Sequence, residues 1–480
     1  MEDTNKFERQ RREKLSRIRE LGVDPYGSRY DNSESAENAK NRYVEGDDSQ
    51  RARCAGRIVL FRDMGKLIFI TVRDWSGTIQ VGLSQKLLAD HWELIKLLEL
   101  GDIIGAEGQL GKTRTGEITI WVDQMRLLSK SVCQPPEKFH GLADIDLRYR
   151  QRYLDLWANP EVMVRFKKRS DIISSIRSFL RERGFLEVET PMMQSIAGGA
   201  AAKPFITHHN SLDMDLYLRI APELFLKRLL VGGMEKIFEI NRNFRNEGLS
   251  RKHNPEFTMM ELYQAYGDYK VMMDLTEELV SSLAEQYCES KQVEYDGNKV
   301  DFGMPWRRAT YAELLKEYSG CDISDIEALR KKAQKLGVEQ SLMADEVVIN
   351  EVFEATVEEN LVNPTFVMDY PAALCPLTKR SAERPEYAER FELYIAKMEL
   401  ANAYTELNDP DVQDENFRVQ LRGQGDTMAT MDDDFVTALK YGMPPAGGLG
   451  IGIDRLTMVL TGAANIRDVI LFPLLKPAKD

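Results

Sequence analysis

Residues 244–263 read Phe-Arg-Asn-Glu-Gly-Leu-Ser-Arg-Lys-His-Asn-Pro-Glu-Phe-Thr-Met-Met-Glu-Leu-Tyr. Apolar segments at 236–240 and 257–263 flank a polar centre that contains Gly and Pro, a pattern that predicts two strands joined by a long charged loop. The loop carries four hydrogen-bond donors suited to a polyphosphate: Arg245, Arg251, Lys252 and His253. An aromatic ring and two carboxylates follow. We therefore predict a nucleotide site beside an acid-lined pocket, with a solvated hairpin with charged tips as the alternative.

The same stretch looks like motif 2 of the class II aminoacyl-tRNA synthetases, in the version carried by lysyl-tRNA synthetases. Two further stretches lie on either side of it, in the order of this family. Residues 184–191, Gly-Phe-Leu-Glu-Val-Glu-Thr-Pro, resemble motif 1, and residues 448–456, Gly-Leu-Gly-Ile-Gly-Ile-Asp-Arg-Leu, resemble motif 3. The resemblance covers the chain from about residue 7 to the end and is weakest over about 268–345.

The composition limits the other classes. The 480 residues suffice for two or three domains, and a net charge of -13 lowers the expectation of nucleic-acid binding without excluding a local basic patch. The five cysteines include no CxxC pair and the five histidines form no ligand pattern, which disfavours structural zinc and suits a reducing compartment. There is no secretory signal and no apolar run near the ~18 residues of a membrane span. We expect a cytoplasmic protein without a membrane partner.

The expected fold class is α+β, in four segments. Residues 1–50 form an N-terminal helix and linker, 51–133 an OB-fold anticodon-binding domain, and 134–159 a linker. Residues 160–480 form a class II catalytic domain with an antiparallel sheet flanked by helices and a helical insertion at about 268–345. The first helix is expected at 6–21, and its basic faces are either solvated or a phosphate-contacting surface for RNA. Residues 28–50 are expected to be irregular.

Residues 52–130 show five short strand patterns, with a helical pattern at 91–100 after the third. The strands are expected at 54–61, 67–73, 78–83, 102–110 and 117–128. This order is that of an OB-fold barrel, which binds single strands by stacking bases on aromatic side chains. Phe69 and Gln80 are the best candidates, and the resemblance implies that they meet the middle anticodon base; Arg62 and Glu117 are weaker candidates. The alternative for a lone strand Phe is the barrel core.

The catalytic domain begins with an amphipathic helix at 160–183 and a strand to Pro191, a pair that forms the homodimer interface in the resembling family. Packing of this helix on its own core is compatible with the same residues. Further strands of one sheet are expected at 216–220, 237–241 and 257–263, with helices at 222–231 and 411–440. A strand pair at 389–407 turns at Ala396-Lys397, where the family often carries Gly-Gly, and a Gly-rich strand at 447–453 enters a helix at Asp454.

The resemblance implies an ATP site formed by Arg245, Glu247, Lys252, His253, Asn254, Phe257, Glu392 and Arg455. Phe257 would stack on one face of adenine and Arg455 on the other. Attack of a carboxylate on the α-phosphorus joins two anions, so the reaction needs cations and alignment more than a general base. Arg245 and Arg455 are the expected catalytic residues, and either Arg251 or Lys252 holds the γ-phosphate.

Glu392 and Glu399 suit Mg²⁺, which prefers one or two carboxylates together with phosphate oxygens. For the amino acid, the resemblance implies Gly199, Glu223, Arg245, Glu261, Tyr263, Asn402, Tyr404, Glu406 and Gly450. Gly199 and Glu223 would lie at the α-amino group and Asn402 near the carboxylate. Asn402, Tyr404 and Glu406 alternate, so they share one strand face. Glu406 with Tyr263, and Glu261 close by, would receive a cationic side chain.

These features predict a homodimeric enzyme that activates lysine with ATP and Mg²⁺ and transfers it to the terminal adenosine of tRNA(Lys). One alternative is an aspartyl or asparaginyl enzyme of the same subclass, whose pocket would need cationic or amide-reading groups. Another is a lysyl transferase that modifies a protein, which would lack the OB domain. A non-catalytic RNA-binding paralogue is the third, and the intact Arg245, Phe257 and Arg455 argue against it.

Overall fold

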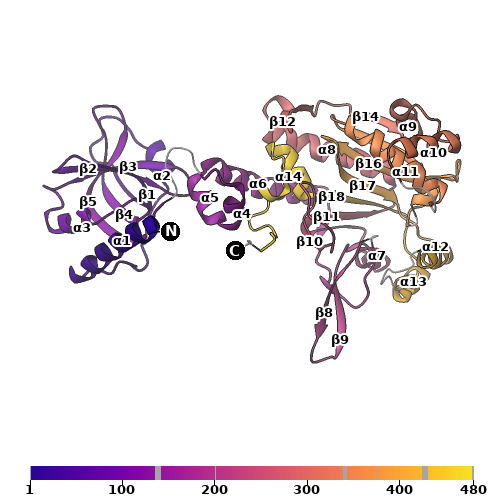
Figure 1. The fold of residues 1–480 in the computed structure, drawn as a ribbon, viewed down its shortest axis with the longest axis horizontal. Helices are drawn as coiled ribbons and strands as arrows, with labels where there is room; N and C mark the ends of the chain where they lie inside the picture. Colours follow the sequence, from indigo (N-terminus) through magenta and orange to yellow (C-terminus); the bar gives the residue numbers. More distant parts are fainter. Residues whose placement is uncertain are drawn as a thin grey trace. The chain divides into compact units, whose positions relative to one another are not determined.

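The computed structural model describes residues 2–135, 142–199, 202–338, 343–375, 377–423 and 431–477. The chain divides into two compact units (Figure 1). Unit 1 comprises Met1–Asp144 and Leu154–Asn159, and unit 2 comprises Ile145–Tyr153 and Pro160–Asp480. Ala200 and Ala201 of the small-residue loop and residues 424–430 of the helix expected at 411–440 lie outside the described part of the chain. No helix among the described residues is both long and apolar enough to cross a bilayer.

Unit 1 is a closed five-stranded barrel in the order β1-β2-β3-β5-β4, which confirms the OB-fold prediction. Its elements are α1 (Glu2–Glu20), α2 (Ala36–Asn41), β1 (Arg51–Asp63), β2 (Leu67–Arg73), β3 (Thr78–Ser84), η1 (Ala89–His91), α3 (Trp92–Lys96), β4 (Ile103–Lys112) and β5 (Ile118–Ser129). The barrel interior is filled by the alternating apolar side chains of the strands, as Ile68, Ile70 and Val72 show in β2. The helix between the third and fourth strands is shorter than predicted.

Two segments that the sequence predicts to be irregular contain helices. Helix α2 lies within 28–50 and begins at Ser35, whose side chain accepts from the backbone N–H of Asn38. The expected linker 134–159 contains α4 (Ile145–Arg150) and α5 (Arg152–Ala158). Within unit 2, the buried Arg152 guanidinium donates to the carbonyl oxygens of Arg467 and Leu471 at 2.7 and 3.0 Å. Charged residues that resemble a solvated linker therefore bind the carbonyls of the C-terminal segment.

Unit 2 contains one large sheet, two small sheets and their covering helices. Its elements before the second half of the large sheet are α6 (Pro160–Glu182), β6 (Leu186–Glu187), β7 (Met193–Gln194), β8 (Phe205–His209), β9 (Met214–Leu218), α7 (Glu223–Val231), β10 (Lys236–Phe244), β11 (Glu256–Ala265), α8 (Tyr269–Tyr287), η2 (Glu289–Lys291), β12 (Gln292–Tyr295) and β13 (Asn298–Asp301). The remaining elements are β14 (Arg307–Thr310), α9 (Tyr311–Ser319), α10 (Ile326–Lys335), α11 (Asp345–Thr356), η3 (Glu358–Asn360), β15 (Thr365–Pro371), η4 (Ala372–Leu374), β16 (Tyr387–Ile395), β17 (Met398–Thr405), α12 (Pro410–Gly423), α13 (Asp433–Lys440), β18 (Ala446–Gly452), α14 (Ile453–Thr461) and η5 (Ile466–Asp468).

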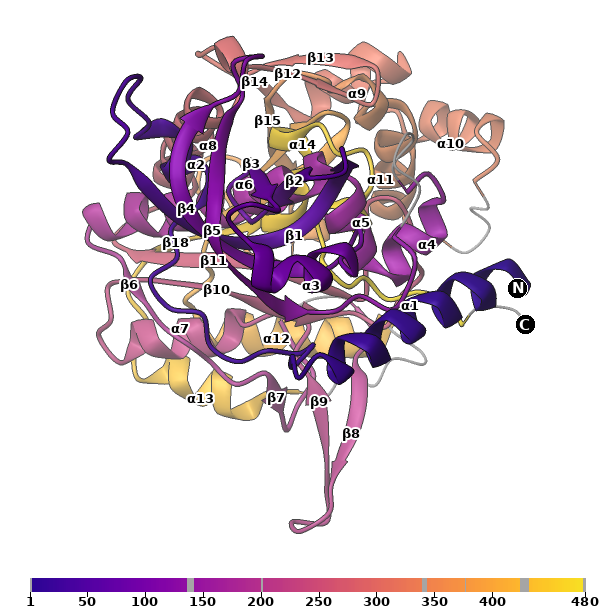
Figure 2. The same ribbon diagram turned by 90° about the vertical axis from the view of Figure 1, so that its left-hand side faces the viewer.

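The large sheet has eight strands in the order β14-β15-β16-β17-β18-β11-β10-β6. Its centre is antiparallel as predicted, but the outer pairs β14–β15 and β10–β6 are parallel, so the sheet is mixed. The strand expected at 216–220 is not part of it. That segment is β9, which pairs with β8 and β7 in a separate sheet and projects with β8 as a hairpin (Figures 1 and 2). Neither side of β9 is buried, so no apolar face directs it to the large sheet.

The two faces of the large sheet differ. Helices α6, α8 and α14 cover one face, and the residues of β11 and β18 that point there, such as Met260, Leu262 and Ile451, are buried in the main core. The opposite face is covered in part by α7, through Leu226 and Leu230. The β16–β17 turn lies at Ala396-Lys397 as predicted, with φ of 52° and 62°. Both residues are left-handed, the conformation in which glycine is least strained.

Candidate active site

Polar side chains form two rows across the face of the sheet opposite α8. Strand register aligns Glu261 of β11, Gly450 of β18, Asn402 of β17 and Glu392 of β16. The next row contains Tyr263, Gly448, Tyr404 and Arg390. Because Gly450 and Gly448 are glycines, β18 presents no side chain between these polar residues, and we call the resulting strip of the sheet face the trough. A Cβ on Gly450 would lie 2.5 Å from the terminal methyl group of Met259 and would displace that side chain.

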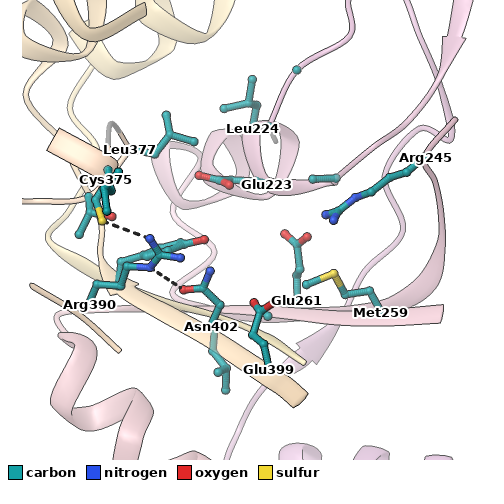
Figure 3. Close-up of a pocket in the computed structure, with 18 of the residues that line it drawn as sticks. Glu223, Leu224, Arg245, Met259, Glu261, Cys375, Leu377, Arg390, Glu399 and Asn402 are labelled. Atoms are coloured by element: carbon teal, nitrogen blue, oxygen red, sulfur yellow. Dashed lines mark hydrogen bonds between the residues drawn. The ribbon is translucent and has the colours of Figure 1, made fainter. Parts of the chain in front are cut away.

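The trough is the floor of a cavity of about 1400 Å³ within unit 2 (Figure 3). The predicted site residues that line it are Gly199, Glu223, Arg245, Glu247, Lys252, His253, Asn254, Phe257, Glu261, Tyr263, Glu399, Asn402, Tyr404, Gly450 and Arg455. Two predicted residues, Glu392 and Glu406, are buried behind its wall. Arg251, the alternative to Lys252, is exposed and does not line the cavity.

Arg245 begins the loop between β10 and β11. Its backbone N–H donates to the carbonyl of Pro255 at 2.8 Å, which closes the base of the loop. Its guanidinium lies 5.2 Å from the centre of the Phe257 ring and points into the cavity (Figure 3), and its buried Nε has no partner among the described residues. An unpaired buried donor is costly, so this position suits an anionic ligand.

Arg455, at the start of α14, is held by two cavity residues. One guanidinium nitrogen, Nη1, donates to the backbone oxygen of Glu399 at 2.6 Å, and the other, Nη2, donates to Nε2 of His253 at 2.9 Å. Desolvation and the neighbouring Arg455 charge lower the pKa of His253, so its ring is neutral and Nε2 accepts. Lys252 donates through Nζ to the carbonyl of Lys397 at 2.8 Å.

The residue before Arg455, Asp454, links the site to helix α6. Asp454 accepts from the backbone N–H of Thr258 at 2.7 Å and pairs with Arg169 of α6 at 2.6 Å. This contact joins α6 to the stretches that resemble motifs 2 and 3. The sequence analysis did not identify Arg169, because a basic residue on an amphipathic helix resembles an exposed one.

Three donors hold the Glu392 carboxylate, whose side chain is 11% exposed. The hydroxyls of Tyr370 and Tyr394 donate to it at 2.7 and 2.8 Å, and Arg390 pairs with it. Burial raises the pKa of Glu392, Arg390 opposes the shift, and the nearby Glu399 adds to it. A positive charge between Glu392 and Glu399 would remove that repulsion.

These residues fit Mg²⁺ bound together with phosphate oxygens, but not a site built from protein ligands alone. No group of three or more His, Cys, Asp or Glu in metal-binding geometry occurs in the described part of the chain. Mg²⁺ requires only one or two carboxylates when substrate phosphates complete its shell. Glu399 lines the cavity and lies 3.4 Å from Arg455.

At the other end of the cavity, Lys227 of α7 pairs with two carboxylates. Its Nζ lies 2.6 Å from Glu223 and 2.6 Å from Glu406. The Glu406 side chain lies over Gly448, where a Cβ would stand 1.9 Å from Oε1. Glu406 does share the face of Asn402 and Tyr404, as predicted, and Lys227 pairs with one of its two carboxylate oxygens. Gly199, with φ of +88°, lies beside Glu223 at the cavity edge.

Glu261 is the buried acid of this end that has no basic partner within hydrogen-bonding distance among the described residues. The hydroxyl of Tyr263 donates to it at 3.2 Å. Burial raises the pKa of Glu261 to about 8, and the neighbouring Glu223 adds to the shift. This pKa favours the protonated form of Glu261 at neutral pH, and a cationic ligand beside the carboxyl would favour the ionised form.

Arg390 is a cavity residue that the sequence analysis missed. Its Nε donates to Oδ1 of Asn402 at 3.1 Å and its Nη1 lies 3.1 Å from Sγ of Cys375 (Figure 3). The contact fixes the Asn402 amide, which leaves its NH₂ group as a donor for a ligand carboxylate. The only signal for Arg390 in the sequence is the alternation of residues along β16. Its contact with Cys375 was not predictable, because Cys375 lies in a different segment.

Unit 1 carries a separate polar and aromatic surface on the outside of its barrel. Phe69 alternates with the buried residues of β2 and meets the Trp121 ring edge-on, with centroids 5.8 Å apart. The core alternative for Phe69 is therefore excluded. Arg62 is paired with Phe69 in register, and Gln80 accepts from Thr119 at 2.8 Å. Glu117 is exposed and lies 3.7 Å from Lys40. Trp121, which lies over Gly82, was not identified from the sequence.

Comparisons with known proteins agree with both units. A family model described as tRNA synthetases class II (D, K and N) matches residues 144–476, and one described as an OB-fold nucleic acid binding domain matches residues 52–128.

Several curated proteins named lysine--tRNA ligase are similar over nearly the whole chain. The one from Pelotomaculum thermopropionicum is 52% identical, over 99% of this chain and 96% of that protein. The one from Syntrophomonas wolfei is 53% identical, over 97% of this chain and 96% of that protein. The one from Carboxydothermus hydrogenoformans is 52% identical over 99% of both chains.

Proposed function

The chain belongs to the class II tRNA synthetases that serve aspartate, lysine and asparagine, and we propose that within this family it joins lysine to tRNA. It activates lysine with ATP to lysyl-adenylate and transfers the lysyl group to the 3′-terminal adenosine of tRNA(Lys). The observation that carries the choice of lysine is the group of three carboxylates, Glu223, Glu261 and Glu406, which Lys227 neutralises only in part. Such a pocket attracts a cationic side chain and repels aspartate.

Adenylate formation brings the lysine carboxylate to the α-phosphorus of ATP. Arg245 points into the cavity between the acidic end and the ATP end, where its guanidinium bridges both anions and stabilises the charge that develops on the phosphate. Phe257 and Arg455 line the same cavity and hold the adenine ring between them. Lys252, rather than Arg251, contacts the γ-phosphate, because only Lys252 reaches the cavity wall.

Glu399 and Glu392 are the residues that would hold Mg²⁺ with the ATP phosphates. The ion, when bound, supplies positive charge that neutralises the phosphate oxygens. Tyr370 and Tyr394 orient the Glu392 carboxylate, and Arg390 holds it on the side of Asn402.

The lysine substrate lies along the glycine strand β18. The Asn402 amide and Arg245 bind its carboxylate, Glu223 and the Gly199 loop bind its α-amino group, and the acids beyond Tyr263 receive its ε-ammonium. Lysine acceptance by tRNA(Lys) transcripts tests the whole assignment. ATP-dependent charging with lysine supports it, and charging with aspartate or asparagine instead would contradict it.

The outer surface of the barrel in unit 1 reads the anticodon through Phe69 and Gln80, with Arg62 and Glu117 beside them. Phe69→Ala is expected to weaken tRNA charging and to leave adenylate formation unchanged, because loss of a stacking ring costs about 1–3 kcal/mol per base. The measurement is kcat/KM for tRNA compared with ATP–pyrophosphate exchange. Phe69→Tyr, which keeps the ring, is the control. Equal loss in both half-reactions would show that Phe69 acts on folding.

Lysine binding should release protons near neutral pH. The pKa of Glu261 is about 8 in the empty protein, so the acid is largely protonated at pH 7, and the bound ammonium lowers that pKa. Lysine affinity should therefore rise with pH until about 8. Calorimetry at pH 7 in two buffers of different ionisation enthalpy measures the released protons, and Glu261→Gln should reduce their number. An unchanged number would remove Glu261 from the account.

The same shift predicts how the stability of the empty protein depends on pH. The pKa of Glu261 in the folded state lies above the reference value of 4.5. Between pH 4.5 and about 8 the folded state therefore binds more protons than the unfolded state. The contribution of Glu261 to the free energy of unfolding is fully present below pH 4.5 and is lost as the pH rises through about 8.

We propose that the enzyme is a homodimer through α6 and the segment that follows it. Large apolar side chains are exposed on these elements, with Val164 of α6, Leu186 of β6 and Met193 of β7 at 63, 54 and 58% exposure. Such exposure suits a protein interface. Light scattering at micromolar protein should give about twice the 55.0 kDa chain mass. A monomer that still forms adenylate would contradict this interface.

The cytoplasmic location predicted from the sequence stays a prediction.

A further inference from the structure

Lys227 is a fully buried cation that bridges two acids of the amino-acid pocket. Its side chain has 0% exposure, and its Nζ lies 2.6 Å from both Glu223 and Glu406. Lys227 and Glu223 both belong to α7, whereas Glu406 follows β17, so this one nitrogen joins the helix to the end of the strand. The two carboxylates raise the pKa of Lys227, so it stays charged.

The two acids that Lys227 joins have different positions in the pocket. Glu223 lines the cavity, and Glu406 lies behind the wall over Gly448. Lys227 pairs with Oε1 of Glu223 and with Oε2 of Glu406. The second oxygen of each carboxylate is left to accept from another ligand. The Oε1 atom of Glu406 is buried and has no hydrogen-bond partner among the described residues. An unpaired carboxylate oxygen in such a place is an acceptor for a cation.

We propose that Lys227 is a specificity-determining, positioning residue, which fixes the spacing of Glu223 and Glu406 so that the pocket selects a diamino acid by the distance between its two ammonium groups. This inference rests on the proposed function. Because one nitrogen holds both acids, neither can move toward a shorter substrate without breaking a buried ion pair. The side chain of ornithine is one methylene shorter than that of lysine, so its two ammonium groups have a shorter reach and would meet the two fixed acids less well.

Lys227 also sets the charge of the pocket. Without it, Glu223 and Glu406 would lose the cation that pairs with both of them, and their protonated forms would be favoured as that of Glu261 already is. The loss would remove the oriented acceptor for the substrate ammonium. Lys227→Met is therefore expected to lower kcat/KM for lysine roughly 10²–10³-fold through KM, as for loss of a buried charge partner. The KM for ATP should change less than about threefold, and the preference for lysine over ornithine should fall at least about tenfold.

Chemical rescue separates this role from packing. Lys227→Ala leaves a space that matches n-propylammonium, the part of the side chain that is removed. We expect n-propylammonium to restore both lysine activation and the preference over ornithine. The neutral n-propanol, of nearly the same shape, should restore neither.

The barrel offers a matched control. Lys130 is also fully buried and also bridges two carboxylates, at 2.9 Å from Glu99 and 3.0 Å from Asp102. Lys130→Met should lower the melting temperature but leave the lysine-to-ornithine preference unchanged. ATP–pyrophosphate exchange with lysine and with ornithine is the measurement for every variant.

Two outcomes would overturn the inference. One is a Lys227→Met enzyme whose lysine kcat/KM and preference lie within about threefold of the parent. The other is a Lys227→Ala enzyme whose melting temperature n-propylammonium restores while its preference for lysine over ornithine stays low. Lys227 would then act on folding alone. A parent enzyme that does not activate lysine is a different result, because it would contradict the proposed function itself.

Discussion

Arg245→Gln is expected to lower kcat/KM for lysine-dependent ATP–pyrophosphate exchange by roughly 10³-fold or more, the effect of removing a cation from a transferring phosphoryl group. The side chain is the cavity cation that faces the acidic end, and its Nε is buried without a protein partner. Gln keeps a hydrogen-bond donor but not the charge or the forked geometry that bridges two anions. The loss should appear in kcat, because the charge on the α-phosphate is greatest in the transition state.

Arg242→Gln is the control for Arg245. Arg242 lies on the same strand, pairs with Glu256 at 3.5 Å and does not line the cavity. The Arg242→Gln enzyme should retain lysine-dependent ATP–pyrophosphate exchange within a few-fold of the parent. If Arg245→Gln also stays within about tenfold, the guanidinium does not bridge the two reactants.

Glu406→Gln is expected to reduce kcat/KM for lysine by roughly two to four orders of magnitude, because loss of a buried charge partner costs about 3–5 kcal/mol. Gln keeps the shape beside Gly448 and Tyr263 but removes the carboxylate on which both Lys227 and the substrate ammonium depend. The KM for ATP should change little, since the adenine and phosphate contacts lie at Phe257 and Arg455.

Glu389→Gln on the neighbouring strand β16 is the control, because Glu389 is partly exposed and does not line the cavity. Lysine activation by Glu406→Gln within a few-fold of the parent would show that Glu406 does not determine specificity. The role would then pass to Glu261, which lines the cavity and has no cationic partner of its own among the described residues.

Local pattern predicted the parts of the site that lie on one strand. Alternation along β17 placed Asn402 and Tyr404 on one face, which the pairing of β17 with β18 confirms. This prediction succeeds because a strand has a period of two and the opposite face of β17 packs into the apolar core through Ala401 and Ala403. The turn at Ala396-Lys397 was predictable from the two flanking strands.

Contacts between distant segments were not predictable in this way. Lys227 lies in a helix beside Arg228, where two basic residues suggest an exposed face, and only the tertiary fold brings it to Glu406. Arg390 meets Cys375 for the same reason. The strand pattern predicted which face of β17 Glu406 shares. It did not predict that Glu406 is fully buried, because the Lys227 that neutralises it comes from a distant helix.

The errors in the fold have related causes. Strand β9 was assigned to the large sheet because its composition fits a strand, but without a buried face its sequence does not specify a partner. Helices α4 and α5 were missed because their charged residues look solvated. The parallel edges at β14 and β6 depend on connections that cross the sheet, which local periodicity does not record.

ATP–pyrophosphate exchange with each of the twenty amino acids tests the central claim most directly, because it measures adenylate formation without tRNA. The acidic pocket of Glu223, Glu261 and Glu406 predicts exchange with lysine and none of comparable rate with the other nineteen. Exchange driven by aspartate or asparagine, or by no amino acid at all, would contradict the account.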